Sequence, residues 1–397
     1  MNLLVVFLSF TLLAVSSANP LAKHDEDADL TVPELITKYG YPAEEHHVIT
    51  EDGYILTLHR IPHGKNPNKS LGKIAFLQHG VLSSSADWII TGPSHGLGYI
   101  LADEGYDVWM GNARGNKLSR NHTSLNPDKD SQFWNFSWHQ IGLIDLPTMI
   151  DYVLEVTNQT ELYYIGHSQG TTTFYVMTSM LPEYNAKIKA QFSLAPIAYM
   201  NHMTSPLLHI IAFWTGPLDL LLQLIGINEF LPSNEFMALV GDILCGDDDI
   251  TQILCSNVLF AICGFSPSEM NATILPALMG HTPAGASVMQ IIHYGQEVIS
   301  GGFRQYDFGL GNWDHYHSWT PPLYDLSQIT TPVYLFYSHN DWLAAEQDVL
   351  RLCKGLGNAC AGKFIVSDNG FNHLDYMFGI HAPEYVYNRV ISLMARH

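Results

Sequence analysis

Short apolar runs recur along the chain, and each is followed by polar or glycine-containing residues. Four of these runs have the length typical of buried strands rather than helices: Lys73–Gln78, Leu162–Ile165, Val333–Tyr337 and Lys363–Val366. The second run leads, through a turn with two glycines, into the helix-compatible segment Thr171–Met180. The pattern therefore predicts strands that are followed by loops carrying the candidate reactive side chains.

The turn after the second strand reads Gly166-His167-Ser168-Gln169-Gly170. Glycines two residues before and after a serine allow a sharp strand-to-helix turn, which holds the hydroxyl clear of the sheet and at a helix N-terminus. Turns that contain glycine and serine also occur without any chemistry, so a purely structural turn is the alternative. The strand-to-helix context favours Ser168 as a nucleophile.

A serine nucleophile needs an acid and a base, and in α/β-hydrolases the three follow the chain order serine, acid, histidine. The predicted strand Val333–Tyr337 is followed by Ser338-His339-Asn340-Asp341, which places a carboxylate just past a strand end. Aspartate and asparagine are also ordinary turn residues. We expect Asp341 to be the acid, and the alternatives are Glu346, Asp368 and Asp375.

The base is expected on the next loop. The predicted strand Lys363–Val366 is followed by Asn369-Gly370-Phe371-Asn372-His373. Most of the 20 histidines must have surface or core roles, but downstream of Asp341 only His381 and His397 compete with His373. Neither of those two follows a strand-like segment, so His373 is the predicted base.

An oxyanion hole is predicted upstream, where His79-Gly80-Val81 follows the strand Lys73–Gln78. In this class of enzyme the hole is built from two backbone N–H groups, one on this loop and one on the residue after the nucleophile. We therefore expect the amides of Val81 and Gln169 to form it. The nearby run Ser83–Ser85 lacks flanking glycines and is interpreted as a polar loop.

These roles predict acyl transfer through a covalent serine ester. His373 would take the Ser168 proton as the hydroxyl attacks a carbonyl carbon, and Asp341 would hold the imidazole tautomer. Water activated by His373 would then release the acyl group. The scheme requires no metal ion and no organic cofactor.

Several segments, in this order, resemble the acid lipase family, which contains the gastric, lingual and lysosomal acid lipases. The similarity runs from about Thr31 to the C-terminus, and the matching segments are Ile36–Pro42, Thr50–Leu56, Leu77–Gly80, Tyr106–Asn112, Gly166–Thr172 and Asn372–Asp375. The acid loop departs from the family, because gastric-type enzymes have glycines where this chain has Ser338-His339-Asn340.

The resemblance implies an α/β-hydrolase fold, in which a mostly parallel sheet is flanked by helices and carries an inserted helical cap and lid. It also implies activity on lipid esters and the same three catalytic residues. Because Ser168 and His373 must share one sheet, the chain is divided into a signal peptide at 1–18, a core at 19–196 and 321–397, and a cap at 197–320.

Within the predicted cap, Leu207–Leu231 is unusually apolar. Gly216, Pro217 and Asp219 in its middle argue against a membrane span, because an ionised carboxylate at the bilayer centre is costly and proline divides a helix. Two short helices that cover an acyl site fit better. The alternatives are a lid that touches lipid and an ordinary buried pair of cap helices.

The N-terminal segment predicts entry into the secretory pathway. Leu3–Val15 is an apolar stretch too short for a membrane anchor, and Ser16-Ser17-Ala18 supplies small residues for cleavage. Five Asn-x-Ser/Thr sequons agree with this route: Asn68, Asn121, Asn135, Asn158 and Asn271. We expect an extracellular or a lysosomal destination, and a monomer.

The five cysteines fit an oxidising compartment. Cys353 and Cys360 are close enough in sequence to close a small loop. The family resemblance implies a second disulfide between Cys245 and Cys255, because the paired cysteines of the family have nearly the same spacing. Cys263 would then be a free thiol. A zinc site is disfavoured, since no Cys-x-x-Cys pair with downstream histidines is present.

The net charge limits the kinds of molecule that the protein is expected to bind. The formal charge is −20 at pH 7 with histidines neutral, and the isoelectric point is about 5.3. Histidine protonation near pH 5 would bring the charge close to zero, which suits approach to an anionic lipid surface in an acidic lumen. The alternative explanation is that the protein has an excess of acidic residues only because they keep it soluble. With 18 basic residues and no basic cluster, nucleic-acid binding is excluded as a function.

Three function classes follow. The first is a lipid esterase acting on triacylglycerol or steryl ester. The second is a serine hydrolase of another substrate class, such as a peptidase or thioesterase, which would need a more polar cleft. The third is a non-catalytic lipid-binding protein, which the presence of Ser168, Asp341 and His373 disfavours.

Overall fold

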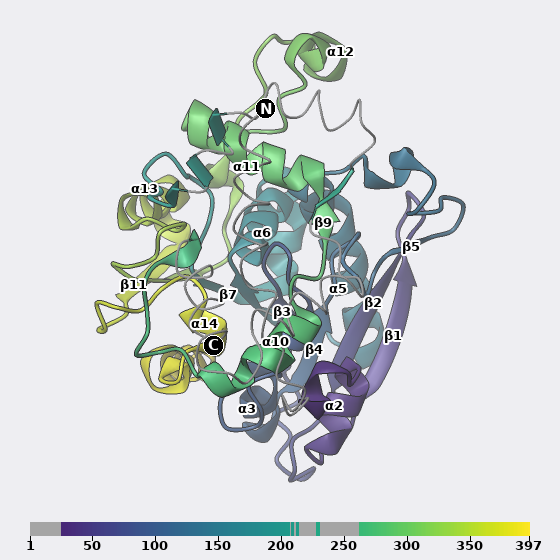
Figure 1. The fold of residues 1–397 in the computed structure, drawn as a ribbon, viewed down its shortest axis with the longest axis vertical. Helices are drawn as coiled ribbons and strands as arrows, with labels where there is room; N and C mark the ends of the chain where they lie inside the picture. The colour runs from purple at the N-terminus through teal and green to yellow at the C-terminus, as the bar shows by residue number, and fades with distance from the viewer. Residues whose placement is uncertain (1–24, 207, 210–211, 214–227, 231–261) are drawn as a thin grey trace, which may run out of the picture.

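The computed structural model describes residues 25–206, 208–209, 212–213, 228–230 and 262–397 (Figure 1). Three predictions therefore fall outside the described residues: the signal peptide at 1–18, the Cys245–Cys255 disulfide, and most of the apolar segment Leu207–Leu231.

A nine-stranded sheet forms the centre of the described structure, in the order β1-β2-β4-β3-β6-β7-β10-β11, with β5 beside β2. The pairs β1–β2, β2–β4 and β2–β5 are antiparallel, and all pairs from β4 to β11 are parallel. The strands are β1 (Glu44–Ile49), β2 (Tyr54–Ile61), β3 (Ile74–Gln78), β4 (Asp107–Gly111), β5 (Asn121–His122), β6 (Leu162–His167), β7 (Ile188–Leu194), β10 (Val333–Tyr337) and β11 (Cys360–Ile365). The predicted α/β class with a mostly parallel sheet is confirmed.

For the four strands that the sequence predicted, burial explains how well their bounds were predicted. Every residue of β3 and β6 is buried, because helices cover both faces of the sheet there. Strand β10 has the predicted bounds. Strand β11 lies at the edge and alternates half-buried and exposed residues, so its first half, Cys360–Gly362, is not apolar enough to be recognised. It begins three residues before the predicted start at Lys363 and ends one residue before Val366.

Helices cover the sheet, and Figure 1 shows β1 and β2 at one edge with α13 and β11 at the other. Helices that contact strands of this sheet include α2 (Val32–Lys38), α3 (Leu97–Asp103), α5 (Leu146–Thr157), α6 (Gln169–Met180) and α13 (Glu346–Leu356), and the shorter helices α4 (Trp138–Gln140), α14 (Asp375–Phe378) and α15 (Asn388–Met394) complete this part of the chain. Helix α6 begins two residues before the predicted Thr171. None of the described helices combines the length and apolarity that a membrane crossing requires.

Between β7 and β10 the chain leaves the central sheet. The described elements of this stretch are α10 (Leu275–His281), α11 (Val288–Ser300), α12 (Asn312–Tyr316) and a two-stranded sheet of β8 (Glu229–Phe230) and β9 (Ala286–Ser287). Figure 1 shows α11 and α12 at one end of the molecule. The division into a core at 19–196 and 321–397 and a cap at 197–320 stays a prediction.

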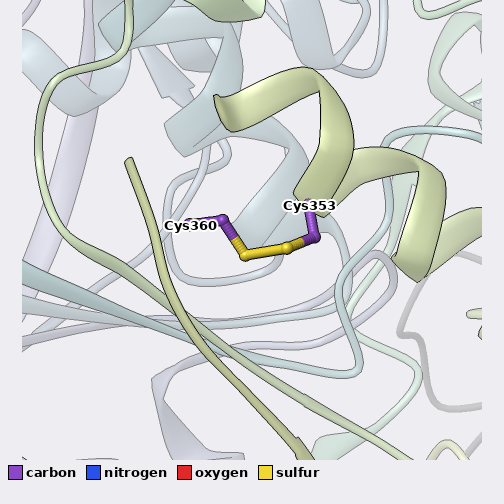
Figure 2. Close-up of a disulfide and its surroundings, with 2 residues drawn as sticks. All are labelled: Cys353 and Cys360. Atoms are coloured by element: carbon purple, nitrogen blue, oxygen red, sulfur yellow. A yellow bond between two sulfur atoms is a disulfide. The ribbon is translucent and has the colours of Figure 1, made fainter. Parts of the chain in front are cut away.

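The structure contains the predicted Cys353–Cys360 disulfide (Figure 2). It joins helix α13 to the first residue of β11, and so links the segment after Asp341 to the strand before His373. Cys263 is a buried free thiol, and burial raises its pKa.

A buried arginine organises the loop after β4. The Arg114 side chain is 1% exposed, and its Nε donates to Oδ1 of the fully buried Asp145 at 2.7 Å. Its terminal nitrogens also bind Asp52, and the guanidinium lies over the Tyr54 ring at 4.0 Å. This network fixes the backbone next to Ala113, whose N–H donates to the His79 imidazole Nε2 at 3.1 Å.

Replacing Asp145 by alanine is expected to lower the free energy of unfolding by about 3–5 kcal/mol, because a buried guanidinium loses a main partner. Glu161→Ala is the matched control, since it breaks a surface pair with Lys189 in which the side chains are 45% and 29% exposed. The control should cost less than about 1 kcal/mol. Denaturant unfolding checks both, and equal losses would show that the buried network carries no special weight.

Candidate active site

Ser168 lies in the sharp turn between β6 and α6 that the sequence predicts. Its backbone has φ 50° and ψ −117°, a conformation that non-glycine residues rarely adopt. The residue is 7% exposed, and it directly precedes Gln169, the first residue of α6. A strained serine at a strand-to-helix turn is the geometry of a nucleophile elbow.

The two glycines that flank the serine are required by close backbone contacts. A Cβ on Gly170 would lie 2.2 Å from the Gln78 carbonyl oxygen, and a Cβ on Gly166 would lie 2.7 Å from Gly170. The turn is therefore pressed against the end of β3, and only glycine fits at either position.

The structure brings together the three residues that the sequence selected. The Ser168 Oγ lies 2.8 Å from the His373 Nε2, and the His373 Nδ1 lies 2.9 and 3.0 Å from the two carboxylate oxygens of Asp341. Each residue follows a strand, β6, β10 or β11, of the parallel part of the sheet. Because parallel strands end at the same edge, the three side chains meet there.

Backbone amides orient the Asp341 carboxylate. Its Oδ1 accepts hydrogen bonds from the N–H groups of Leu343 and Ala344 at 2.9 and 2.8 Å. The carboxylate is buried, so these donors compensate for its lost hydration. The Asp341 carboxylate is thus held from one side by its own loop, with both oxygens within 3.0 Å of the His373 Nδ1.

The alternative acids and bases have other partners. Glu346 contacts the imidazole of His339, Asp368 accepts from the Gly370 N–H, and Asp375 accepts from the Asn372 N–H. His381 pairs with Glu269 and His397 with the Tyr334 hydroxyl. None of these five groups hydrogen-bonds the Ser168 hydroxyl or the His373 ring in the described structure.

Two buried histidines that were not selected from the sequence bind the backbone of the loops around the site. The His167 Nε2–H donates to the His373 carbonyl oxygen at 2.9 Å, and burial lowers the pKa of His167 to about 3. The His79 Nδ1–H donates to the Gly80 carbonyl at 2.7 Å, while its Nε2 accepts from the Ala113 N–H. Burial lowers the pKa of His79 to about 4, so both imidazoles are neutral at pH 5 to 7.

The loop His79–Ser83 follows β3 and is called the oxyanion loop below, after the role that the sequence predicts for it; it approaches the serine closely. A Cβ on Gly80 would lie 3.2 Å from the Ser168 Cβ, and Leu82 has a positive φ of 62°. Val81 lines the same cavity as Ser168. The backbone of this loop is therefore beside the serine, as the oxyanion-hole prediction requires.

An apolar cavity of about 70 Å³ opens onto Ser168. Its other lining residues are mostly aliphatic and come from the oxyanion loop, from segment 197–208, from α11 and from the acid loop: Val81, Ile197, Met200, Leu208, Ile291, Tyr294, Gly295, Val298 and Leu343. Such a lining suits an acyl chain. In the described parts of the chain, no group of histidine, cysteine and carboxylate side chains is arranged to hold a metal ion.

Asp87 connects the oxyanion loop to the segment after α10. Its carboxylate accepts from the Ser83 hydroxyl and, at 2.8 Å, from the Thr282 hydroxyl. The Ala284 N–H donates to the Leu82 carbonyl at 2.7 Å, which reinforces the connection. Asp87 is 3% exposed, and burial raises its pKa to about 6.

The sequons occupy accessible positions. Asn68, Asn121, Asn135 and Asn158 are exposed, whereas Asn271 is half-buried and its side chain accepts from the Thr273 N–H. Glycosylation at these five sites stays a prediction.

Gly170→Ala is expected to displace the serine turn from β3, because the new methyl group meets the Gln78 carbonyl oxygen. The variant should lose about 1–3 kcal/mol of stability and react more slowly with a fluorophosphonate at Ser168. Gly311→Ala is the control, since an added Cβ there approaches no atom closer than 3.3 Å. Equal labelling rates for wild type and Gly170→Ala would contradict the assigned contact.

Asp87→Asn is expected to change how stability depends on pH. Between pH 3.8 and about 6 the folded protein keeps the Asp87 proton that the unfolded chain has lost, so wild-type stability falls as pH rises through this window. The variant lacks this loss. Its unfolding free energy relative to wild type should therefore increase by about 1–3 kcal/mol from pH 4 to pH 7. A difference that stays constant across this range would show that Asp87 does not titrate there.

Comparison with known proteins agrees with the fold. A family model for a partial alpha/beta-hydrolase lipase region matches residues 32–92, and one for the alpha/beta hydrolase fold matches residues 76–227. Among solved structures, a carboxylesterase from Bacillus subtilis aligns with a TM-score of 0.50 at 14% identity, over 92% of this chain and 95% of that one. At this identity the likeness concerns the fold alone.

The sequence relatives are closer. Lipase 1 of Drosophila melanogaster is 42% identical over 94% of this chain and 81% of its own length. The gastric triacylglycerol lipase of Rattus norvegicus is 40% identical over 94% of both chains. The human lysosomal acid lipase/cholesteryl ester hydrolase is 37% identical over 100% of this chain and 98% of its own. The chain therefore belongs to the family of gastric and lysosomal acid lipases, which are carboxylic ester hydrolases with the α/β-hydrolase fold.

Proposed function

We propose that this protein hydrolyses carboxylic esters of neutral lipids through an acyl-enzyme formed on Ser168. The observation that carries the proposal is the continuous hydrogen-bonded chain from Asp341 through His373 to Ser168, which ends at an apolar cavity. A serine activated in this way attacks a carbonyl carbon, and an apolar cavity beside it accommodates a hydrocarbon chain.

Each residue has a defined role in this scheme. His373 accepts the Ser168 proton through Nε2 as the hydroxyl attacks, and then gives the proton to the departing alcohol. Asp341 keeps the Nδ1 proton on the imidazole and stabilises the imidazolium that forms. Water then gives a proton to His373 as its oxygen attacks the acyl carbon, the bond from that carbon to the Ser168 Oγ breaks, and His373 returns the proton to Oγ as the carboxylic acid leaves.

The negative oxygen of the tetrahedral intermediate is assigned to the backbone N–H groups of Val81 and Gln169. Gln169 is the first residue of α6, so its N–H has no partner within the helix and lies at the positive end of the helix dipole. The close approach of the Gly80–Val81 backbone to Ser168 supports the second donor. Two such donors make a large contribution to catalysis of acyl transfer.

The proposed substrates are triacylglycerol, cholesteryl ester or both. The aliphatic lining of the cavity supports a lipid acyl group over a peptide, and the gastric and lysosomal relatives carry the names of triacylglycerol and cholesteryl ester hydrolases. The same relatives support secretion, with the gut lumen or the lysosome as the working compartment.

The proposal includes activity at acidic pH, and it assigns neutralisation of the net charge partly to groups other than histidines. Burial lowers the pKa of six histidines, to about 3 or 4 in five of them and well below the usual 6.5 in His293, so they contribute little to neutralising the charge of −20 near pH 5. Buried carboxyl groups contribute instead, because burial raises the pKa of Asp87 to about 6 and that of Asp375 to about 7. Neutralisation on acidification thus involves interior carboxyl groups as well as surface histidines.

Hydrolysis of triolein and cholesteryl oleate emulsions by the purified protein, from pH 4 to pH 9, tests the function. We expect a maximum below about pH 6.5, because the proposed compartment is acidic, and no turnover by Ser168→Ala. Turnover of the alanine variant near the wild-type rate would refute the nucleophile. Absence of lipid hydrolysis, with Ser168 still labelled by a fluorophosphonate, would point to another class of ester or thioester.

The acid is tested by comparing two aspartates on neighbouring loops. Asp341→Asn should reduce kcat by about 10⁴-fold, because the imidazole is then held in the wrong tautomer. Asp375→Asn is the matched comparison, since Asp375 is buried nearby and binds the Asn372 N–H rather than the imidazole. A larger loss of kcat in Asp375→Asn than in Asp341→Asn would overturn the assignment.

A further inference from the structure

Three consecutive carbonyl groups lie between the loops that carry the acid and the base. They belong to Cys263–Phe265, which is called the strap below. The Cys263 carbonyl accepts from the Trp342 N–H at 3.3 Å and from the His373 N–H at 3.4 Å. Because Trp342 follows Asp341 directly, this one oxygen contacts both loops at the positions where they carry the reacting side chains.

The other two carbonyls of the strap bind asparagine side chains. Asn372, just before His373, donates from Nδ2 to the Gly264 carbonyl at 2.9 Å. Asn340, just before Asp341, donates from Nδ2 to the Phe265 carbonyl at 2.8 Å. The residue before the acid and the residue before the base thus use the same group, a side-chain amide, to bind the same three-residue segment.

Each asparagine also has a second contact that fixes its loop. Asn340 donates from Nδ2 to the Gly370 carbonyl at 2.7 Å, which joins the acid loop directly to the base loop. The Asn372 Oδ1 accepts from the N–H groups of Leu374 and Asp375 at 2.8 and 3.1 Å, which closes the turn around His373. Asn372 is 1% exposed, so its amide has no access to competing water.

The strap fits only because Gly264 has no side chain. Its φ is 114°, a conformation reserved for glycine, and a Cβ there would lie 2.1 Å from the Asn340 carbonyl oxygen. The strap and the acid loop are therefore in direct backbone contact, in addition to the hydrogen bonds.

This arrangement explains what holds Asp341 and His373 at bonding distance. The preceding strands β10 and β11 are paired up to Tyr337 and Ile365, and the Val366 N–H still reaches the Tyr337 carbonyl. Beyond that point the two loops contain three and six further residues before the acid and the base. The strap and the two asparagines supply the connections that the sheet no longer provides.

We propose that Asn340 and Asn372 are positioning residues, which bind the strap carbonyls and so set the distance between Asp341 and His373 during ester hydrolysis. The proposal rests on the assigned roles of Asp341 and His373. It adds two residues that act through the acid and the base without touching the substrate.

The test compares Asn340→Ala, Asn340→Asp and Asn372→Ala with the wild-type protein. The quantities are kcat and KM for a soluble short-chain p-nitrophenyl ester, the rate of fluorophosphonate labelling at Ser168, and the unfolding midpoint. We expect kcat and the labelling rate to fall together by about 10- to 100-fold, because displacing a reacting group by about 1 Å costs about 100-fold in rate. KM should change by less than about threefold, since neither side chain lines the cavity.

Asn185→Ala is the matched control for stability. Asn185 is also buried and also binds several backbone groups, namely the Thr178 and Pro182 carbonyls and the Thr331 N–H, but it lies at the opposite ends of β7 and β10. Its replacement should lower the unfolding midpoint at least as much as Asn340→Ala, while kcat of the folded protein stays within about threefold.

Two results would overturn the proposal. One is that the folded Asn340 and Asn372 variants keep kcat and the labelling rate within about threefold of wild type. The other is that Asn185→Ala loses as much kcat as the Asn340 and Asn372 variants. The loss of kcat would then follow from reduced stability and not from the position of the acid and the base. If the wild-type protein labels at Ser168 but hydrolyses no ester, the proposed function fails, and the labelling rates alone decide the role of the asparagines.

Discussion

The close contact between the serine turn and the end of β3 is the constraint on which the rest of the site depends. Gly170 packs against the Gln78 carbonyl, and Gly80 packs against Ser168. These contacts force the backbone of Ser168 into its unusual conformation and place the first turn of α6 beside the oxyanion loop. The nucleophile and the proposed oxyanion donors are thus positioned by the same packing contact, and the base and the acid need only reach this fixed point.

Neutral polar side chains surround the Asp341–His373 pair. His79 and His167 are buried near the serine and kept uncharged by burial; each donates its N–H to a backbone carbonyl, and the other ring nitrogen of His79 accepts from the Ala113 N–H. A second positive charge beside His373 would oppose formation of the imidazolium in the transition state. Burial keeps these two imidazoles uncharged, so they would not oppose protonation of the proposed base His373, and their hydrogen bonds hold the loops in place.

The sequence predicted the parts of the site that follow from chain order and local pattern. Ser168 was selected by its flanking glycines, and Asp341 and His373 by their positions after strands in the expected order, and the structure places the three side chains within hydrogen-bonding distance. His167, Asn340 and Asn372 were missed because their partners are carbonyls from segments far away in the chain, and no local pattern identifies those. The start of β11 was missed for a related reason, since an edge strand with one exposed face lacks a continuous apolar run.

The strap determines which positions near the site can change among related sequences. All three of its acceptors are main-chain carbonyls, so the side chains at 263 and 265 can be exchanged without removing a single acceptor. Gly264 alone is fixed by geometry, whereas Phe265 is 56% exposed. Related sequences should therefore retain the dipeptides Asn-Asp and Asn-His together with one glycine, while the exposed residue after that glycine varies. The surface of the enzyme next to its acid and base is in this sense open to substitution, although the backbone beneath it is not.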